Sequence, residues 1–301
     1  MAVVNTNVNA SIAQNALMKN ERSMNTAMER LSTGQRINGA KDDAAGLAIS
    51  SRMTSQIRGL EVGVRNANDA ISMISTADGA LIEITNMLQR MRELALQSAN
   101  GTTTSADRDY LNTEYKNLIL EMERIAQNTQ WNGSAMLQGT ANGTGSEVKF
   151  QVGANGGQTI AVNFGNVSQD SGSGGTIFSS FEQSAGAAGN ISATVGWHIS
   201  AGTAAAAVTT AADAMATIDS AITVVNSQRA TFGAAMNQLT YAVDNLSNVK
   251  VNAEAARSRV LDTDYAVETS ELARTQIIQQ AGTAMLAQAN QLPQTVLSLL
   301  Q

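Results

Sequence analysis

Apolar residues recur at every seventh position through residues 57–95, with no proline to interrupt them. One row consists of Leu60, Ala67, Ile74, Leu81, Leu88 and Ala95, and a second row of Ile57, Val64, Ile71, Ala77, Ile84 and Met91. The spacing predicts an α-helix, and the second row shifts by one place because 3.6 residues per turn do not divide evenly into seven. At about 1.5 Å per residue this helix is roughly 58 Å long, so it requires a partner of similar length.

A matching heptad repeat in the last hundred residues predicts that partner. Its apolar positions are Val208, Ala211, Met215, Ile218, Ile222, Val225, Phe232, Met236, Leu239, Val243, Leu246 and Ala253. Two facing seams of this length favour long helices packed side by side. Arg229 lies within the seam, either as a buried residue that fixes the register or as one whose side chain reaches the edge.

A shorter helix and a β-hairpin are predicted between the two long helices. Thr104 or Ser105, followed by Asp107, can cap a helix. Its apolar positions are Leu111, Tyr115, Leu118, Met122 and Ile125. The alternating runs 148–152 and 160–164 flank a glycine-bearing loop, which is typical of a hairpin.

The two ends of the chain carry weaker heptads of mostly small and polar residues. Gly34 and Gly39 are expected to end the first of these helices and to begin a polar connector. Their larger apolar side chains are Leu17, Met24, Leu31, Ile278, Met285, Leu292, Val296 and Leu299. Ordering one residue costs about 1–2 kcal/mol, and seams this narrow do not offset that cost in isolation. We therefore predict that both ends are disordered in the monomer and become helical only against copies of the chain, with these side chains in the polymer core. Repetition of such a contact without closure gives a helical filament.

Together the patterns predict a mainly α fold. A long antiparallel helical bundle or coiled coil is formed by the N- and C-terminal segments, with a small β-hairpin and a Gly/Ser-rich insert in the middle. The expected divisions are 1–33 with 265–301 as terminal helices, 34–46 with 256–264 as connectors, 47–165 with 208–255 as the helical rod with its hairpin, and 166–207 as a short variable surface insert.

Composition argues against several kinds of partner and site. The net charge is −6 and the basic residues are scattered, which argues against nucleic acid. No apolar run approaches the roughly eighteen residues of a membrane span, and no signal peptide is recognisable, so export would use another route. The absence of cysteine excludes disulfides and thiolate metal sites.

No residue pattern indicates catalysis or a cofactor. Asp42 and Asp43 precede a predicted helix, where carboxylates accept N–H groups; a metal site is the alternative. His198 is the sole histidine, so a zinc-protease helix with two histidines is excluded. We expect no enzyme activity, no bound metal and no cofactor.

Several long motifs at both termini resemble those of bacterial flagellins. They are residues 1–7 (MAVVNTN), 31–38 (LSTGQRIN), 41–48 (KDDAAGLA), 88–95 (LQRMRELA), 256–260 (ARSRV), 279–283 (QQAGT) and 292–300 (LPQTVLSLL). The resemblance implies a secreted subunit of the flagellar filament, exported unfolded by the type III apparatus and used for motility. The terminal helices would form the inner tube of the filament, the long helices the outer tube, and the insert its outer face.

The same resemblance implies partners and a recognition patch. The partners are other copies of the chain, an export chaperone at the C-terminal segment, the filament cap and the hook-filament junction proteins. Gln89, Arg90, Arg92, Glu93 and Leu94, with Glu114 of the next helix, are similar to the patch that Toll-like receptor 5 reads in receptor-activating flagellins. Arg90, Leu94 and Glu114 would be the main contacts, and the same surface would pack subunit against subunit.

Two other classes of protein fit the helical pattern. One is a hook-filament junction protein related to flagellin, and the other is a non-polymerising coiled-coil binding module. Sedimentation after seeding or salting-out separates them, because only the filament subunit gives long polymers.

Overall fold

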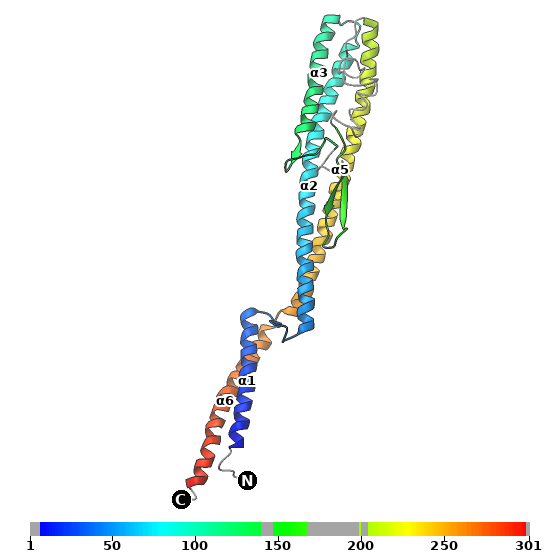
Figure 1. Ribbon diagram of the computed structural model, residues 1–301. Coiled ribbons are helices and arrows are strands. Elements are labelled where there is room, and N and C mark those ends of the chain that lie inside the picture. The colour runs from blue at the N-terminus through cyan, green and yellow to red at the C-terminus, as the bar shows by residue number, and fades with distance from the viewer. Residues whose placement is uncertain (1–6, 140–146, 168–198, 200–203, 299–301) are drawn as a thin grey trace. The chain divides into compact units, whose positions relative to one another are not determined.

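The computed structural model describes residues 7–139, 147–167, 199 and 204–298, without the side chains of 204–208 and 292–298. Its helices are α1 (Val8–Thr33), α2 (Ala44–Ser98), α3 (Ser105–Asn128), α5 (Ala204–Leu261) and α6 (Tyr265–Ser298) (Figure 1). Its strands are β1 (Gln130–Trp131), β2 (Ser134–Ala135), β3 (Glu147–Gln151) and β4 (Thr159–Asn163), which form two antiparallel pairs, β1–β2 and β3–β4. The predicted mainly α fold with a small hairpin is confirmed.

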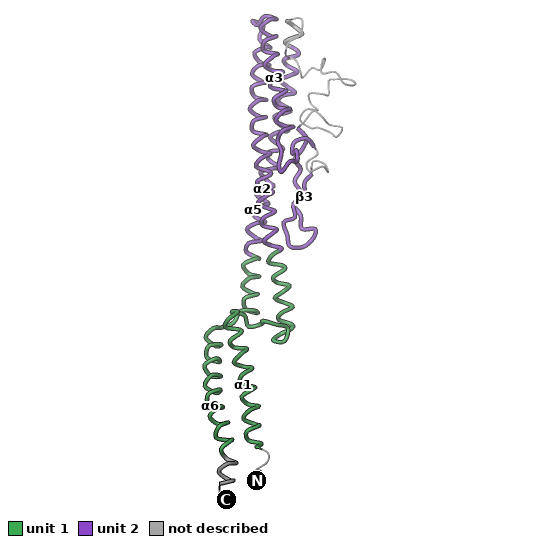
Figure 2. Tube along the Cα trace, turned by 60° about the vertical axis from the view of Figure 1, so that its left-hand side comes forward, with its two compact units in different colours: residues 1–58, 249–301 green, residues 59–248 purple. Residues whose placement is uncertain are grey.

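The chain divides into two compact units. One contains residues 1–58 and 249–301, and the other residues 59–248 (Figure 2). The long helices α2 and α5 contribute residues to both units.

In the first unit, α1 and α6 lie side by side and run antiparallel (Figures 1 and 2). Gly34 ends α1 in the left-handed conformation, with φ +70°, and its N–H donates to the Arg30 carbonyl at 2.9 Å. This confirms the predicted helix stop, because glycine adopts positive φ without a Cβ penalty.

The paired aspartates before α2 serve as caps. Asp43 Oδ1 accepts a hydrogen bond from the Gly46 N–H at 2.8 Å, and Asp42 Oδ2 accepts from the N–H groups of Asn38 and Gly39 at 3.1 Å. The bond to Asp43 satisfies a backbone donor that α2 itself leaves unpaired, whereas the bonds to Asp42 close the connector before the helix.

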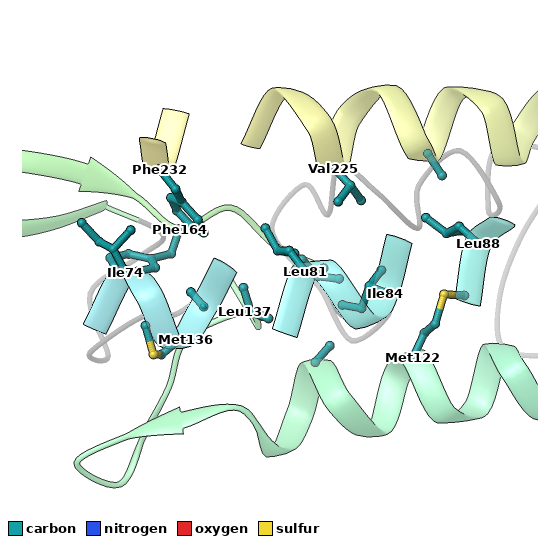
Figure 3. Close-up of a cluster of buried hydrophobic side chains, with 14 of the residues drawn as sticks. Ile74, Leu81, Ile84, Leu88, Met122, Met136, Leu137, Phe164, Val225 and Phe232 are labelled. Atoms are coloured by element: carbon teal, nitrogen blue, oxygen red, sulfur yellow. The ribbon is translucent and has the colours of Figure 1, made fainter. Parts of the chain in front are cut away.

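In the second unit, α2, α3 and α5 pack around one apolar core. Figure 3 shows this core with Ile74, Leu81, Ile84, Leu88, Met122, Met136, Leu137, Phe164, Val225 and Phe232. The rings of Phe164 and Phe232 are 5.3 Å apart at a tilt of 53°. Met136, Leu137 and Phe164 fill the space beside the long helices, so the segments that flank the strands complete the helical core.

Ion pairs at the edge of this core join α2 to α5. Arg229 Nε lies 2.9 Å from Asp78 Oδ1, with side chains 35% and 24% exposed. Of the two alternatives for Arg229, the structure therefore favours the edge position, with Asp78 as a partner that the heptad pattern alone did not identify.

The turn between α2 and α3 is fixed by polar side chains. Thr104 caps α3 and forms a reciprocal capping box with Asp107, as predicted. The Thr104 hydroxyl, followed by the Thr104 N–H, stabilises the carboxylate and lowers the pKa of Asp107. Arg108 is only 3% exposed, and its guanidinium donates to the carbonyls of Ser98 and Asn100. It therefore neutralises the carbonyl end of α2.

The predicted β-hairpin is present as β3 and β4, with Val148 opposite Val162 and Phe150 opposite Ile160. Its loop approaches α2 closely: a Cβ on Gly63 would lie 2.7 Å from the Val152 carbonyl oxygen. The β1–β2 pair was not predicted. Asn132 and Gly133 form its two-residue turn, both with positive φ, at 49° and 78°.

Candidate functional site

The pairing of α1 with α6 leaves many of their apolar side chains exposed. Ala27 is the only buried apolar side chain among those described on the two helices. Eight large apolar side chains of these helices are 44–67% exposed: Val8, Ile12, Met18, Met28, Val267, Ile277, Ile278 and Met285. Helices with so little buried surface are marginal alone, because helical stability in proteins comes mainly from packing an apolar face.

An apolar groove of about 490 Å³ lies between the amino-terminal part of α1 and the middle of α6. We call it the terminal groove; it is lined by Asn9, Ile12, Ala13, Ala16, Leu17, Ile278, Gly282, Met285, Gln288 and Ala289. Its lining contains no charged residue. The groove is thus suited to an apolar side chain or helix face rather than to an ion.

The predicted core residues are distributed around this groove. Leu17, Ile278 and Met285 line it. Met24 and Leu31 are half-buried further along α1. Leu292 and Val296 belong to α6 at positions whose side chains are not described, and Leu299 lies outside the described residues.

Ile12 and Gly282 are two of the groove residues that the heptad pattern missed. Ile12 does not belong to the predicted heptad of α1, but its side chain lines the groove and is 62% exposed. Gly282 has no side chain to register as apolar, and a Cβ there would lie 2.6 Å from Leu17 Cδ2. A helical glycine opposite a leucine is the signal that could have identified this contact.

A second candidate site lies on the exposed face of α2 near α3 and α5. We call it the charged patch; it consists of Gln89, Arg90, Arg92, Glu93 and Glu114. Arg90 bonds to Glu93 on the same helix at 3.0 Å and to Glu114 on α3 at 2.9 Å. Arg92 reaches to the other side and bonds to Asp219 of α5 at 2.7 Å. The two arginines thus extend in opposite directions from one helix.

Hydrogen bonds to carboxylates hold these arginines in place. The bond to Glu93, followed by that to Glu114, raises the pKa of Arg90, and the bond to Asp219 raises the pKa of Arg92. Because all these groups are about half exposed, the pairs contribute little to folding stability. Their effect is to present a fixed pattern of charge on the surface.

Leu94 does not contribute to that surface. Its side chain is 1% exposed and belongs to the apolar core of the second unit. Leu94 follows Met91 by three positions and precedes Ser98 by four, which is the spacing of the buried face of α2. Leu96, 59% exposed, is the leucine that lies outward on this part of the helix.

The described residues match neither the pattern of a metal site nor that of a membrane span. They contain no cluster of three or more His, Asp or Glu side chains placed to hold a metal. In the same part of the chain, no helix combines the length and apolar character needed to cross a bilayer. His198 lies outside the described residues.

The fold and the exposed apolar side chains of its terminal helices are those expected of a helical structural protein that associates with copies of itself. Comparison with known proteins supports this class. The family model for the bacterial flagellin N-terminal helical region matches residues 4–142, and that for the C-terminal helical region matches residues 215–300.

Relatives match over the full length of the chain. Flagellin A of Vibrio cholerae serotype O1 is 39% identical, covering 99% of both chains, and a flagellin of Xenorhabdus nematophila is 44% identical, covering 100% of this chain and 99% of its own. The crystal structure of Bacillus cereus flagellin is 31% identical, covering 60% of this chain and 88% of that one, with a TM-score of 0.46.

The chain belongs to the bacterial flagellin family. It is a subunit of the extracellular flagellar filament, a structural component of motility and not an enzyme. Full-length similarity to flagellins favours this function over a junction protein or a non-polymerising coiled-coil module.

Proposed function

We propose that the terminal groove is the surface through which the flagellin chain enters the core of its polymer. The observation that carries this is the incomplete cover of α1 and α6, whose only buried apolar side chain among those described is Ala27. Exposed Ile12 and Met285 provide apolar area that a neighbouring copy can bury. Segments 1–33 and 265–301 would then line the inner tube of the filament.

We propose the remaining layers from the similarity to flagellins. Residues 47–165 and 208–255 would form the outer tube, with 34–46 and 256–264 as connectors and 166–207 on the outer face. We extend the proposal to partners: an export chaperone on the C-terminal segment, the filament cap and the hook-filament junction proteins. The exposed apolar side chains of α6, such as Ile277, are the kind of surface that a chaperone covers before assembly.

The charged patch is proposed to serve lateral contacts between subunits and recognition by Toll-like receptor 5. Its support is the fixed geometry of Arg90 between Glu93 and Glu114. A receptor reporter assay with Arg90→Ala and Glu114→Ala tests recognition, and Arg124→Ala, on an exposed part of α3, is the matched control. Equal responses from all three variants would contradict the receptor role.

Seeded polymerisation tests the groove. Met285→Glu places a charge where we expect an apolar contact, so it should raise the critical concentration about tenfold or more. Gln280→Glu adds the same charge at an exposed position of α6 outside the groove and should change it little. Sedimentation measures both; assembly of Met285→Glu at the unsubstituted critical concentration would refute the proposal.

A further inference from the structure

The seam between α1 and α6 does not select a single alignment by the apolar area that it buries. Its side chains are mostly small or half-buried, and the same kind of residue returns after each heptad. Pairings displaced by seven residues would therefore bury similar apolar area. A unique alignment requires contacts that exist in one register only.

An ion pair supplies the first of these contacts. Arg30 of α1 bonds to Glu268 of α6 at 2.8 Å, and the Glu268 side chain is only 8% exposed. A displacement of one heptad would move these groups apart by about 10 Å along the helix axis. The buried carboxylate would then lack its partner, which is strongly unfavourable.

A side-chain amide supplies the second contact. Asn20 Nδ2 donates to the Gln279 side-chain oxygen at 3.1 Å and to the Thr275 carbonyl at 2.7 Å. Every residue offers a carbonyl, so only the contact with Gln279 depends on the register. A one-heptad displacement would replace Gln279 by Leu272 or Leu286.

The third contact is steric. Leu17 lies against Gly282, where an added Cβ would be 2.6 Å from Leu17 Cδ2. After a one-heptad displacement Leu17 would face Thr275 or Ala289, which both carry a Cβ. Leucine and glycine thus form a knob and hole that fit only in the observed register.

We propose that these three contacts, Arg30–Glu268, Asn20–Gln279 and Leu17–Gly282, select the register in which α1 pairs with α6. Buried polar contacts are known to specify alignment in helix pairs at some expense of stability. The selected register brings Ile12 and Met285 into the terminal groove. Register selection acts within one chain whenever α1 and α6 pair, which the predicted disorder of both ends makes transient in the monomer, and only its consequence for assembly rests on the proposed function.

Disulfide trapping in the full chain tests the proposal, because the sequence contains no cysteine. The pair Ala10→Cys and Ala289→Cys reports the observed register. Asn7 donates to the Ala289 carbonyl at 2.8 Å and accepts from the Ala10 N–H, so residues 10 and 289 lie close together in this register. Ala10→Cys with Val296→Cys reports a one-heptad displacement. Oxidation in dilute solution with a stabilising osmolyte, which favours burial and so populates the paired helices, followed by non-reducing electrophoresis gives the ratio of the two intrachain products, which we expect to be about ten or more.

Exchanging the charges of Arg30 and Glu268 then tests whether this ion pair selects the register. Arg30→Glu and Glu268→Arg should each lower the ratio roughly tenfold, because like charges meet in a buried site, and the double exchange should restore it. Arg22→Glu, at an exposed position of α1 with no ion pair among the described residues, is the matched control. A ratio near one in the unsubstituted chain, no effect of the single exchanges, or no rescue by the double exchange would overturn the proposal. Loss of sedimenting filaments with an unchanged ratio would count against the proposed function alone.

Discussion

Arg108 offers a quantitative test of how the α2–α3 turn is held. Its guanidinium is 3% exposed and donates to the carbonyl oxygens of Ser98 at 3.0 Å and Asn100 at 3.2 Å, and to the Thr103 hydroxyl at 3.2 Å. Arg108→Met keeps the aliphatic part of the side chain but removes all three hydrogen bonds. The carbonyl end of α2 then lacks both its hydrogen bonds and its positive charge.

The loss can be estimated from these bonds. A hydrogen bond to a charged group contributes about 1.5–3 kcal/mol, and the cost of burying the guanidinium opposes part of the total. We therefore expect Arg108→Met to lower the free energy of unfolding of the 59–248 unit by about 2–4 kcal/mol. Arg124→Met is the control, because Arg124 is 60% exposed and bonds only to Glu121 of its own helix within the described residues.

Urea unfolding followed by tryptophan fluorescence measures the difference, since Trp131 is half-buried in the 59–248 unit. The reasoning predicts a lower midpoint for Arg108→Met at an unchanged m-value and little change for Arg124→Met. Equal midpoints for the two variants would show that the buried guanidinium does not hold the turn.

Two further predictions concern the same unit. Burial raises the pKa of Tyr115, so the folded state loses stability as pH rises above about 10, where the unfolded phenol ionises. Unfolding titrations should show a smaller alkaline loss for Tyr115→Phe than for the control Tyr110→Phe, which is 77% exposed; equal losses would contradict this. Gly63→Ala should destabilise the unit and expose the hairpin loop to protease, because the added Cβ would lie 2.7 Å from the Val152 carbonyl oxygen. Gly79→Ala, in the same helix with open space around it, should raise stability by about 0.5–1 kcal/mol, so a similar gain at Gly63 would be inconsistent with a docked hairpin.

Local signals in the sequence predicted much of the fold. The capping box of Thr104 and Asp107, the stop at Gly34 and the β3–β4 hairpin each depend on residues close together in the chain. The two long helices were predicted because their heptads persist over many turns. Such signals do not require knowledge of what lies across the core.

Contacts between distant residues could not be predicted in the same way. The partner of Arg229 is Asp78, 151 positions earlier, and nothing in either local sequence selects that pair. The guanidinium of Arg108 was missed because a charged residue near a helix start is usually exposed. Leu94 was placed on a surface by resemblance to a motif, although the spacing from Met91 already put it on the buried face of α2.

For the candidate surfaces, too, the sequence predicted some residues and only the structure revealed others. The heptads of the chain ends indicated Leu17, Ile278 and Met285, which the structure brings together in the terminal groove. Ile12 and Gly282 required the observed alignment of α1 on α6 before their role was visible. Disorder of both ends in the monomer stays a prediction, which the small buried area of the pair supports.

Amide hydrogen exchange tests the central claim that α1 and α6 are stabilised by neighbouring copies of the chain. In a dilute, unassembled sample the amides of residues 8–33 and 265–298 should exchange far faster than those of the core around Leu81 and Leu88. In assembled filaments the same amides should become protected. Protection of both ends in the dilute sample as strong as that of the core would contradict the account.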